Sequence, residues 1–289
     1  MLELKLMITS PLLSPFLKND RLLMLALDHR GSFEKIMDVK EKTPQTLSKL
    51  IEIKSKIIKC LYPLFSGVLV DLEYGLPAYN MVNKDISPQS QKPYLLCIEK
   101  TGYEEKDHER TTLLDCTVDQ LVEKGAKGVK ILLFFNPHAK SASVQLNTAK
   151  EVLAECKKNN VPFFLELVTY PISGIDISGE NLVISSVKYF LERNVEADIF
   201  KLEYPGDPDS CTKITSLLNQ TPWILLSKGE PFEKFLEHIS IASNNGCSGF
   251  LAGRSIWQEI NEHLLSDLDS YLKNTVFSRF SQIADITAG

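Results

Sequence analysis

The sequence predicts an α/β protein built on a single (β/α)8 barrel, the TIM barrel. Three observations support this fold class: short apolar runs recur along the chain, amphipathic segments lie between them, and no long linker interrupts the alternation. Continuous apolar runs are typical of strands that are buried on both faces of a parallel sheet. Strand and helix patterns alternate about eight times within 289 residues. We therefore expect right-handed crossovers and a sheet that closes into a barrel.

Eight apolar runs are expected to form the barrel strands. Turn or polar residues bound each run; the first, LLMLALD, is apolar up to its last residue, Asp28. An open, doubly wound sheet is the alternative, but the glycine-rich GxGxxG turn that follows the first strand of such sheets is missing. The expected strands span residues 22–28, 67–73, 94–99, 128–135, 162–168, 198–204, 223–229 and 249–255.

Amphipathic segments between these runs are expected to form the outer helices. Residues 43–65 place Leu50 and Ile58 on one side of a helix and lysines on the other. Gly125 and Gly246 stand where two further helices should end. We expect one domain over residues 1–289, with a short N-terminal extension and a C-terminal helix. The other expected helices span 111–125, 144–160, 181–194, 232–246 and 261–285.

The composition argues against several classes of function. A formal net charge of −5 disfavours non-specific nucleic-acid binding, which requires a basic surface. The longest apolar runs are too short to span a membrane, and Glu3 and Lys5 interrupt the N-terminal stretch where a signal peptide would be apolar. The six cysteines and five histidines are scattered, without a CxxC pair or an HxxxH motif. We therefore expect reduced thiols, no metal site and a cytoplasmic location.

Polar residues interrupt the expected strands at matching places. In a TIM barrel the catalytic residues lie at the carboxyl ends of the strands. Lys130 and Lys201 matter most, because an ammonium ion is costly to desolvate unless it is paired or neutralised. The interrupting residues are Asp28, Arg30, Asp71, Glu73, Lys130, Glu166, Lys201, Glu203, Ser227, Lys228 and Arg254.

Three of these residues occupy successive strands and together indicate carbonyl chemistry. Burial and a nearby ammonium, that of Lys130, both favour the neutral amine of Lys201, which is the form that attacks a ketone. Glu166 lies on the strand between them and supplies a carboxylate for proton transfer. The residues alone leave two other interpretations open: a strand-end lysine that reaches water, and a structural Lys–Glu ion pair.

The last two strand ends indicate a phosphate site. Ser227, Lys228 and Gly229 form a turn between a strand and a helix start, and Gly253 and Arg254 do the same after the next strand. The corresponding loops of TIM barrels commonly bind phosphate. Glycine lets the backbone approach an anion, and arginine adds a forked donor. A tight turn with a surface arginine is the alternative.

These segments together resemble the tagatose 1,6-bisphosphate aldolase family, which consists of class I aldolases on TIM barrels. The segment from Pro222 to Trp257 is also similar to the 6-deoxy-6-sulfofructose 1-phosphate aldolases. The opening LALDHRGSF is similar to the aldolase-like domain joined to some inositol-catabolism kinases. The resemblance rests on LALDHRGSF (25–33), VLVDLEYGLPA (68–78), VKILLFF (129–135), PFFLELVTY (162–170), FKLEYP (200–205) and PWILLSKG with SGFLAGRSIW (222–257).

The resemblance implies a role for each matching residue. Lys201 corresponds to the Schiff-base lysine, Glu166 to the acid/base residue and Lys130 to the lysine that lines the site. Asp28 and Arg30 correspond to the residues that bind the ketose hydroxyls. Ser227, Gly253 and Arg254 correspond to the residues around the phosphate. Glu73, Lys228 and Gly229 complete the expected substrate-binding set.

The implied activity is cleavage of a phosphorylated ketose to dihydroxyacetone phosphate and an aldehyde, without a cofactor, because the protonated imine stabilises the developing charge. The expected partner is a small molecule, the phosphorylated ketose. Neither nucleic acid nor a membrane is expected as a partner. A sugar-phosphate isomerase or epimerase, with Glu166 as base, and an inactive sugar-phosphate sensor are the alternatives.

The identity of the ketose and the oligomeric state stay open. His29 stands where the bisphosphate aldolases usually have glutamine, and Lys228 replaces a small residue beside the anion loop. With Tyr170, these two residues are candidates for contacting the far end of the sugar. A homo-oligomer is compatible with the expected C-terminal helix, which can pack on a partner or on its own barrel through Leu264, Leu265, Leu268 and Leu272.

Overall fold

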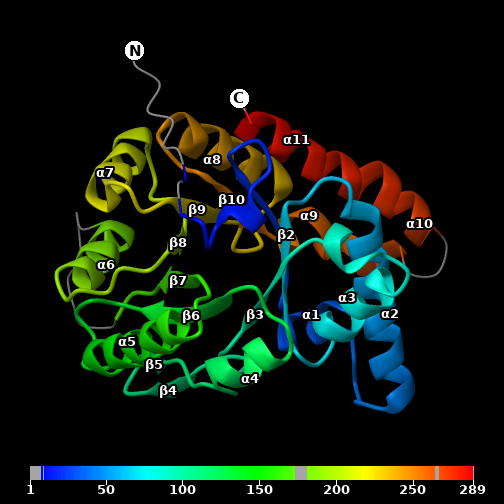
Figure 1. The fold of residues 1–289 in the computed structure, drawn as a ribbon, viewed down its shortest axis with the longest axis horizontal. Helices are drawn as coiled ribbons and strands as arrows, with labels where there is room; N and C mark the ends of the chain where they lie inside the picture. The colour runs from blue at the N-terminus through cyan, green and yellow to red at the C-terminus, as the bar shows by residue number, and fades with distance from the viewer. Residues whose placement is uncertain (1–7, 9, 173–180, 264–266, 289) are drawn as a thin grey trace.

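A computed structural model describes residues 8, 10–172, 181–263 and 267–288 of the chain. Eight parallel strands close into a barrel in the order β1-β10-β9-β8-β7-β6-β3-β2, which confirms the predicted fold class (Figure 1). The barrel strands are β1 (Leu22–Leu27), β2 (Gly67–Val70), β3 (Tyr94–Cys97), β6 (Val129–Phe135), β7 (Phe163–Thr169), β8 (Ile199–Leu202), β9 (Trp223–Leu226) and β10 (Gly249–Ala252).

Helices surround the barrel on its outside (Figure 1). They are α1 (Gly31–Ile36), α2 (Pro44–Leu61), α3 (Gly75–Asn83), α4 (Val118–Glu123), α5 (Ala142–Lys158), α6 (Leu182–Leu191), α7 (Pro208–Leu218), α8 (Phe232–Asn244), α9 (Arg254–Trp257), α10 (Leu268–Tyr271) and α11 (Phe277–Ala288). None of these helices is both long and apolar enough to cross a membrane, as far as the described residues go.

The barrel interior is filled by every second side chain of the strands. Met24, Leu69, Phe164 and Leu251 belong to this inner apolar cluster and are buried. A short helical turn, Ser14–Phe16, precedes β1, and the ring of Phe16 packs edge-on against Phe164, with 5.8 Å between ring centroids. Because Phe16 also contacts the first residue of β2, this turn closes the amino-terminal end of the barrel.

Two expected helices differ from the structure. Residues 111–125 are only partly helical: an antiparallel hairpin of β4 (Glu104–Lys106) and β5 (Glu109–Thr111) precedes α4. Helix α4 begins after Thr117, whose hydroxyl accepts from the backbone N–H of Gln120 while the Gln120 side chain accepts from the Thr117 N–H. This capping box, rather than the apolar spacing, determines the start of the helix.

The expected C-terminal helix is interrupted. A π-helical turn, Leu272–Val276, lies between α10 and α11, and both of its end residues are buried. The thiol of Cys60 on α2 donates to the Leu272 carbonyl at 3.2 Å, so this segment packs on its own barrel. Leu268 is partly buried against the same core. Leu264 and Leu265 lie outside the described residues.

Several features of the outer layer were not expected from the sequence. Helices α1, α3 and α7 were not predicted, and Lys54 on α2 does not face solvent with the other lysines but is fully buried. All six cysteines are free thiols, as expected, and four of them are buried: Cys97, Cys156, Cys211 and Cys247.

Candidate active site

The strand register brings the predicted catalytic residues into one layer of the barrel interior. Glu166 on β7 and Lys201 on β8 are directly paired in register. Lys130 on β6 pairs with Phe164, two residues before Glu166 on the same face of β7. Because Phe164 points into the barrel, the alternation of side chains along each strand directs all three polar residues inward as well.

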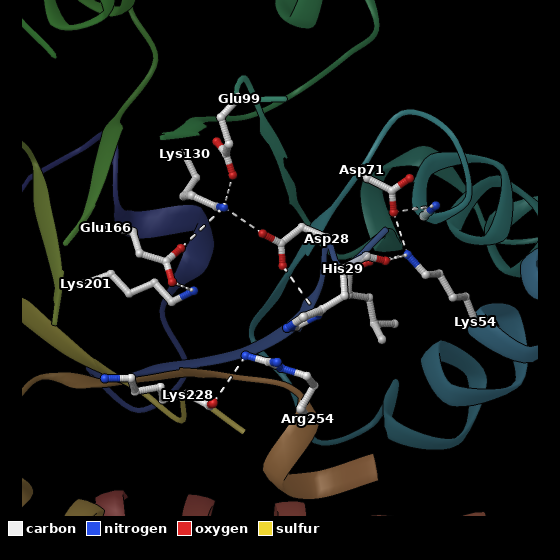
Figure 2. Close-up of polar contacts among 12 residues, drawn as sticks. Asp28, His29, Lys54, Asp71, Glu99, Lys130, Glu166, Lys201, Lys228 and Arg254 are labelled. Carbon is white, nitrogen blue, oxygen red and sulfur yellow. Dashed lines mark hydrogen bonds and ion pairs between the residues drawn. The ribbon is translucent and has the colours of Figure 1, made fainter. Parts of the chain in front are cut away.

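The charged atoms of this layer form a continuous network (Figure 2). The Lys201 amine lies 2.8 Å from one Glu166 oxygen, and the Lys130 amine lies 3.3 Å from the other. The Lys130 amine also lies 2.6 Å from an oxygen of Asp28 and donates to the Glu99 carboxylate. The side chain of Lys130 is fully buried, and that of Lys201 is 5% exposed.

The network holds Lys130 as a cation and Asp28 as an anion. Burial alone would lower the pKa of Lys130, but the carboxylates around it, Asp28 first, raise the pKa well above its ordinary value. Burial alone would raise the pKa of Asp28, but the charge of Lys130 outweighs burial and holds this pKa far below its ordinary value. Burial raises the pKa of Glu99, although Lys130 opposes the shift. Lys130 is therefore a fixed positive charge beneath Glu166.

Next to Asp28, the imidazole of His29 is held in its neutral form. Burial lowers the pKa of His29 to about 3, against the attraction of Asp28. Its ring packs edge-on against Trp257, with 5.3 Å between centroids. Its Nδ1 atom is buried without a hydrogen-bond partner in the described part of the chain.

One group of potential metal ligands occurs among the described residues, and a lysine occupies it. Ligand atoms of Asp28, Cys97 and Glu99 lie within 4.8 Å of one another. The ammonium group of Lys130 already forms ion pairs with both carboxylates. The carboxylates of this donor set therefore serve as partners of Lys130.

The turns after β9 and β10 form the second part of the site. The Arg254 guanidinium donates to the Lys228 carbonyl at 3.2 Å. Gly229 has a φ of +77°, and a Cβ atom there would lie 3.1 Å from the guanidinium carbon of Arg254, so glycine leaves room for the arginine. The Nε atom of Arg254 is buried without a hydrogen-bond partner among the described residues. An anionic ligand would supply that missing acceptor.

A cavity of about 700 Å³ at the carboxyl ends of the strands joins the two parts. Its lining includes most of the expected site residues. These are Asp28, His29, Arg30, Lys130, Glu166, Tyr170, Lys201, Ser227, Lys228, Gly253 and Arg254.

The structure corrects the position of Glu73. Strand β2 ends at Val70, and the Asp71 carboxylate accepts the backbone N–H groups of Glu73, Tyr74 and Gly75 at the start of α3. This turn leaves Glu73 exposed, where it pairs with Lys42 at 3.2 Å. Glu73 is not part of the cavity lining, so the structure does not bring it together with the other residues of the expected substrate-binding set.

Three other expected residues are less available to a substrate: Arg30 and Lys228 form contacts with other side chains, and Gly229 lies outside the cavity lining. Arg30 donates to the Asp115 carboxylate at 3.2 Å and to the Glu99 carbonyl, so it braces the wall of the cavity. The Lys228 amine turns away from Arg254 and pairs with Glu203. Gly229 lies behind Arg254 rather than in the lining.

Two charged groups of the site were missed, although each left a signal in the sequence. Glu99 is the last residue of its predicted strand, in the same position as Asp28 in the first strand. Lys54 lies four residues after Leu50 and four before Ile58, on the apolar side of its helix. Its amine donates to the Leu27 and His29 carbonyls, at 2.6 and 2.8 Å, and lies 2.5 Å from Asp71. It therefore fixes the chain on both sides of Asp28 (Figure 2).

The closed parallel barrel, with its inward amine and carboxylate at one end, has the architecture of a barrel enzyme. The chain belongs to the DeoC/LacD family of aldolases, which it matches over residues 22–259. The protein is therefore an aldolase, as the sequence predicted.

Curated relatives of the chain are aldolases, and solved structures share its fold. The chain is 29% identical to a tagatose 1,6-diphosphate aldolase of Streptococcus agalactiae, over 83% of this chain and 82% of the relative. It is 27% identical to the tagatose 1,6-diphosphate aldolase of Lactococcus lactis, over 92% and 90%. An archaeal fructose 1,6-bisphosphate aldolase, solved with its catalytic lysine bound to a carbinolamine intermediate, shares the fold with a TM-score of 0.64. That match covers 96% of this chain and 98% of the other, at 16% identity.

Proposed function

We propose that the protein is a class I aldolase that cleaves a phosphorylated ketose through a Schiff base on Lys201. The observation that carries this proposal is the 2.8 Å contact between the buried amine of Lys201 and Glu166 at the open end of the barrel. A carboxylate at that distance can take a proton from the amine and return it to the substrate. Tagatose 1,6-bisphosphate is the first candidate substrate, because the relatives above are named for it.

The reaction begins with the transfer of a proton from Lys201 to Glu166. The free amine adds to the ketone at C2, and the oxygen of the resulting carbinolamine takes the proton from Glu166 and leaves as water. The product is a protonated imine, which withdraws electrons from the neighbouring C3–C4 bond. Removal of the C4 hydroxyl proton by Glu166 then breaks this bond, and the aldehyde leaves.

The remaining enamine is converted to the second product by the same groups, acting in the reverse order. Protonation at C3 restores the imine, and water adds to C2 and releases dihydroxyacetone phosphate and the Lys201 amine. Throughout, Lys130 holds one oxygen of Glu166, which keeps the other directed at Lys201. Arg254 and the turn at Ser227 would hold the phosphate on C1, because the buried Nε atom of Arg254 has no hydrogen-bond partner in the part of the chain that the structure describes.

Borohydride trapping tests the Schiff base directly. We expect sodium borohydride with a ketose phosphate to inactivate the enzyme and to add the mass of the reduced adduct to the peptide that contains Lys201. Lys201→Ala should abolish trapping, whereas Lys130→Ala should slow it but leave it possible. Conversion of the ketose phosphate without cleavage and without trapping would favour the isomerase alternative, which forms no imine. A panel of ketose phosphates, assayed for dihydroxyacetone phosphate, would then identify the substrate.

A further inference from the structure

The β4–β5 hairpin places an arginine at the mouth of the cavity, outside the set of residues used so far. Arg110 lies in the middle of β5 and is part of the cavity lining. Strand β5 contacts β6, so the hairpin lies over one wall of the barrel mouth. Arg110 has no role in the Schiff-base steps, which raises the question of what its charge serves.

The backbone of Arg110 is fixed from two sides. The Tyr170 hydroxyl accepts its N–H group at 2.9 Å. The Gln145 side chain, which is buried, donates to the carbonyls of Arg110 and Phe134, at 3.2 and 2.6 Å. The hairpin is thereby joined to α5 and β6, so Arg110 belongs to a fixed position rather than to a free loop tip.

A second attachment anchors the same strand to the start of α5. The two oxygens of Glu109 accept the backbone N–H groups of Lys140 and Ser141, at 2.9 and 2.8 Å. These groups lie just before and at the cap of the helix, where a carboxylate is favoured.

The guanidinium of Arg110 is held between aromatic rings. Its central carbon lies 4.6 Å from the ring centroid of Tyr103, 5.0 Å from that of Tyr170 and 5.7 Å from that of Phe134. Among the described residues its ion pair is with Glu105, at 3.7 Å, and that carboxylate is half exposed. An ion pair of this kind is weak, so the fork of N–H donors stays available to a ligand.

The barrel order places this cation opposite the first one. Four steps around the barrel separate β10, which leads into Arg254, from β6, which lies beneath Arg110. Lys201 on β8 lies halfway between them, two steps from each. A ketose attached to Lys201 through C2 has its C1 group toward Arg254, and its far end then extends toward the opposite wall.

We propose that Arg110 binds a second anionic group at the far end of the ketose, a phosphate or a sulfonate, and thereby selects doubly anionic substrates. This inference rests on the proposed aldolase function, since Lys201 defines the position of C2. Both oxyanions present tetrahedral oxygens that a guanidinium can bind through two N–H groups. Tyr103, Tyr170 and Phe134 restrict the side chain and so reduce the entropy lost when it binds.

The test compares substrates with and without the second anion. For Arg110→Met, which keeps the length of the stem against the rings, we expect KM for tagatose 1,6-bisphosphate to rise on the order of 10- to 100-fold. KM for tagatose 1-phosphate should stay unchanged. Arg110→Lys should restore part of the difference, because the charge returns without the fork. The same comparison with 6-deoxy-6-sulfofructose 1-phosphate distinguishes a sulfonate from a phosphate.

Arg193 offers a matched control outside the cavity. Its guanidinium also stacks on a tyrosine, 3.7 Å from the Tyr189 ring centroid, and also forms a 3.7 Å ion pair, with Glu192. Arg193→Met should leave both KM values as they are in the unmodified enzyme. If Arg110→Met changes both substrates equally, or neither, the proposal is wrong.

Binding of unreactive analogues separates this proposal from the aldolase chemistry. Hexitol 1,6-bisphosphate and hexitol 1-phosphate lack the ketone, so calorimetry reports their affinity whether or not an imine forms. We expect the bisphosphate to bind more tightly, and Arg110→Met to remove that advantage. If this pattern holds without turnover of any ketose, the aldolase function fails while the anion site stands. Equal affinities in the unmodified protein would overturn the anion site.

Discussion

Glu166 and Lys201 are neighbours in register on β7 and β8, and their charged atoms lie 2.8 Å apart inside the barrel. The second oxygen of Glu166 faces Lys130, at 3.3 Å, so the carboxylate is divided between two amines. One of these amines is surrounded by carboxylates, and the other has Glu166 as its ion-pair partner in the described part of the chain. In the proposed mechanism this asymmetry separates the two roles: Lys130 stays a cation and Lys201 is the nucleophile.

Replacing Glu166 with glutamine removes the proton carrier and keeps the shape of the side chain. We expect Glu166→Gln to lower kcat by about 10²- to 10⁴-fold, the usual contribution of a positioned acid/base group. Glu166→Asp should recover part of the rate at a longer distance. Steady-state release of dihydroxyacetone phosphate measures both, and an unchanged kcat in the glutamine variant would remove Glu166 from the mechanism.

Arg254 should act on binding of the phosphorylated substrate rather than on the chemical steps. Since its Nε atom has no hydrogen-bond partner among the described residues, loss of the guanidinium should remove a hydrogen bond to the phosphate. We expect Arg254→Met to raise KM for a ketose 1-phosphate about 10- to 100-fold. Arg254→Lys should be intermediate. A drop in kcat alone would contradict this role.

Acid should destabilise the fold through His29. Its folded-state pKa of about 3 is below the ordinary value of 6.5, so the unfolded chain binds more protons between these values. The free energy of unfolding should therefore fall as the pH drops below 6.5, with a limiting slope of about 1.4 kcal/mol per pH unit from this group. Urea titrations between pH 7 and pH 4 measure the slope, because pH 7 lies above the interval between the two pKa values and pH 4 lies inside it. His29→Gln should flatten it, and an equally steep variant would exclude His29 as the source.

Lys54 should be essential for stability because its partner is also buried. Lys54→Met leaves Asp71 as an uncompensated charge, and we expect a loss of about 3–5 kcal/mol in the free energy of unfolding. The double variant Lys54→Met with Asp71→Asn should lose less. Lys59, exposed on the same helix, provides the control through Lys59→Met. If Lys54→Met alone is as stable as Lys59→Met, the buried ion pair contributes little to the free energy of unfolding.

The parallel barrel could be predicted because its strands are buried on both faces and therefore read as continuous apolar runs. The interior layer was also accessible, since Lys130, Glu166 and Lys201 are costly interruptions of such runs. Most predicted runs extend past the ends of the observed strands. Polar residues such as Asp28 and Glu203 follow the last hydrogen-bonded residue of their strands, and their side chains form ion pairs at the carboxyl end of the barrel.

Other parts of the site depend on tertiary contacts that spacing does not encode. Glu73 and Asp71 are both acidic and adjacent to the same strand end, yet Asp71 is fully buried on Lys54 and Glu73 is exposed. The turn into α3 decides between them, and its backbone hydrogen bonds are a property of the folded chain. Arg110 was missed for a similar reason, because its hairpin lies between the strand expected at 94–99 and the helix expected at 111–125, and contacts with Tyr170 and Gln145 hold it in place.

The apolar turn at Phe16 has a consequence for the passage of molecules. Together with Leu13 and the inner cluster, it fills the amino-terminal end of the barrel as far as the described residues reach. Substrate and both products then share the one mouth at the carboxyl ends. In the proposed mechanism the three-carbon half stays covalently attached to Lys201 while the aldehyde departs. The bond thus sets the order of release, and the closed floor gives both products the same route.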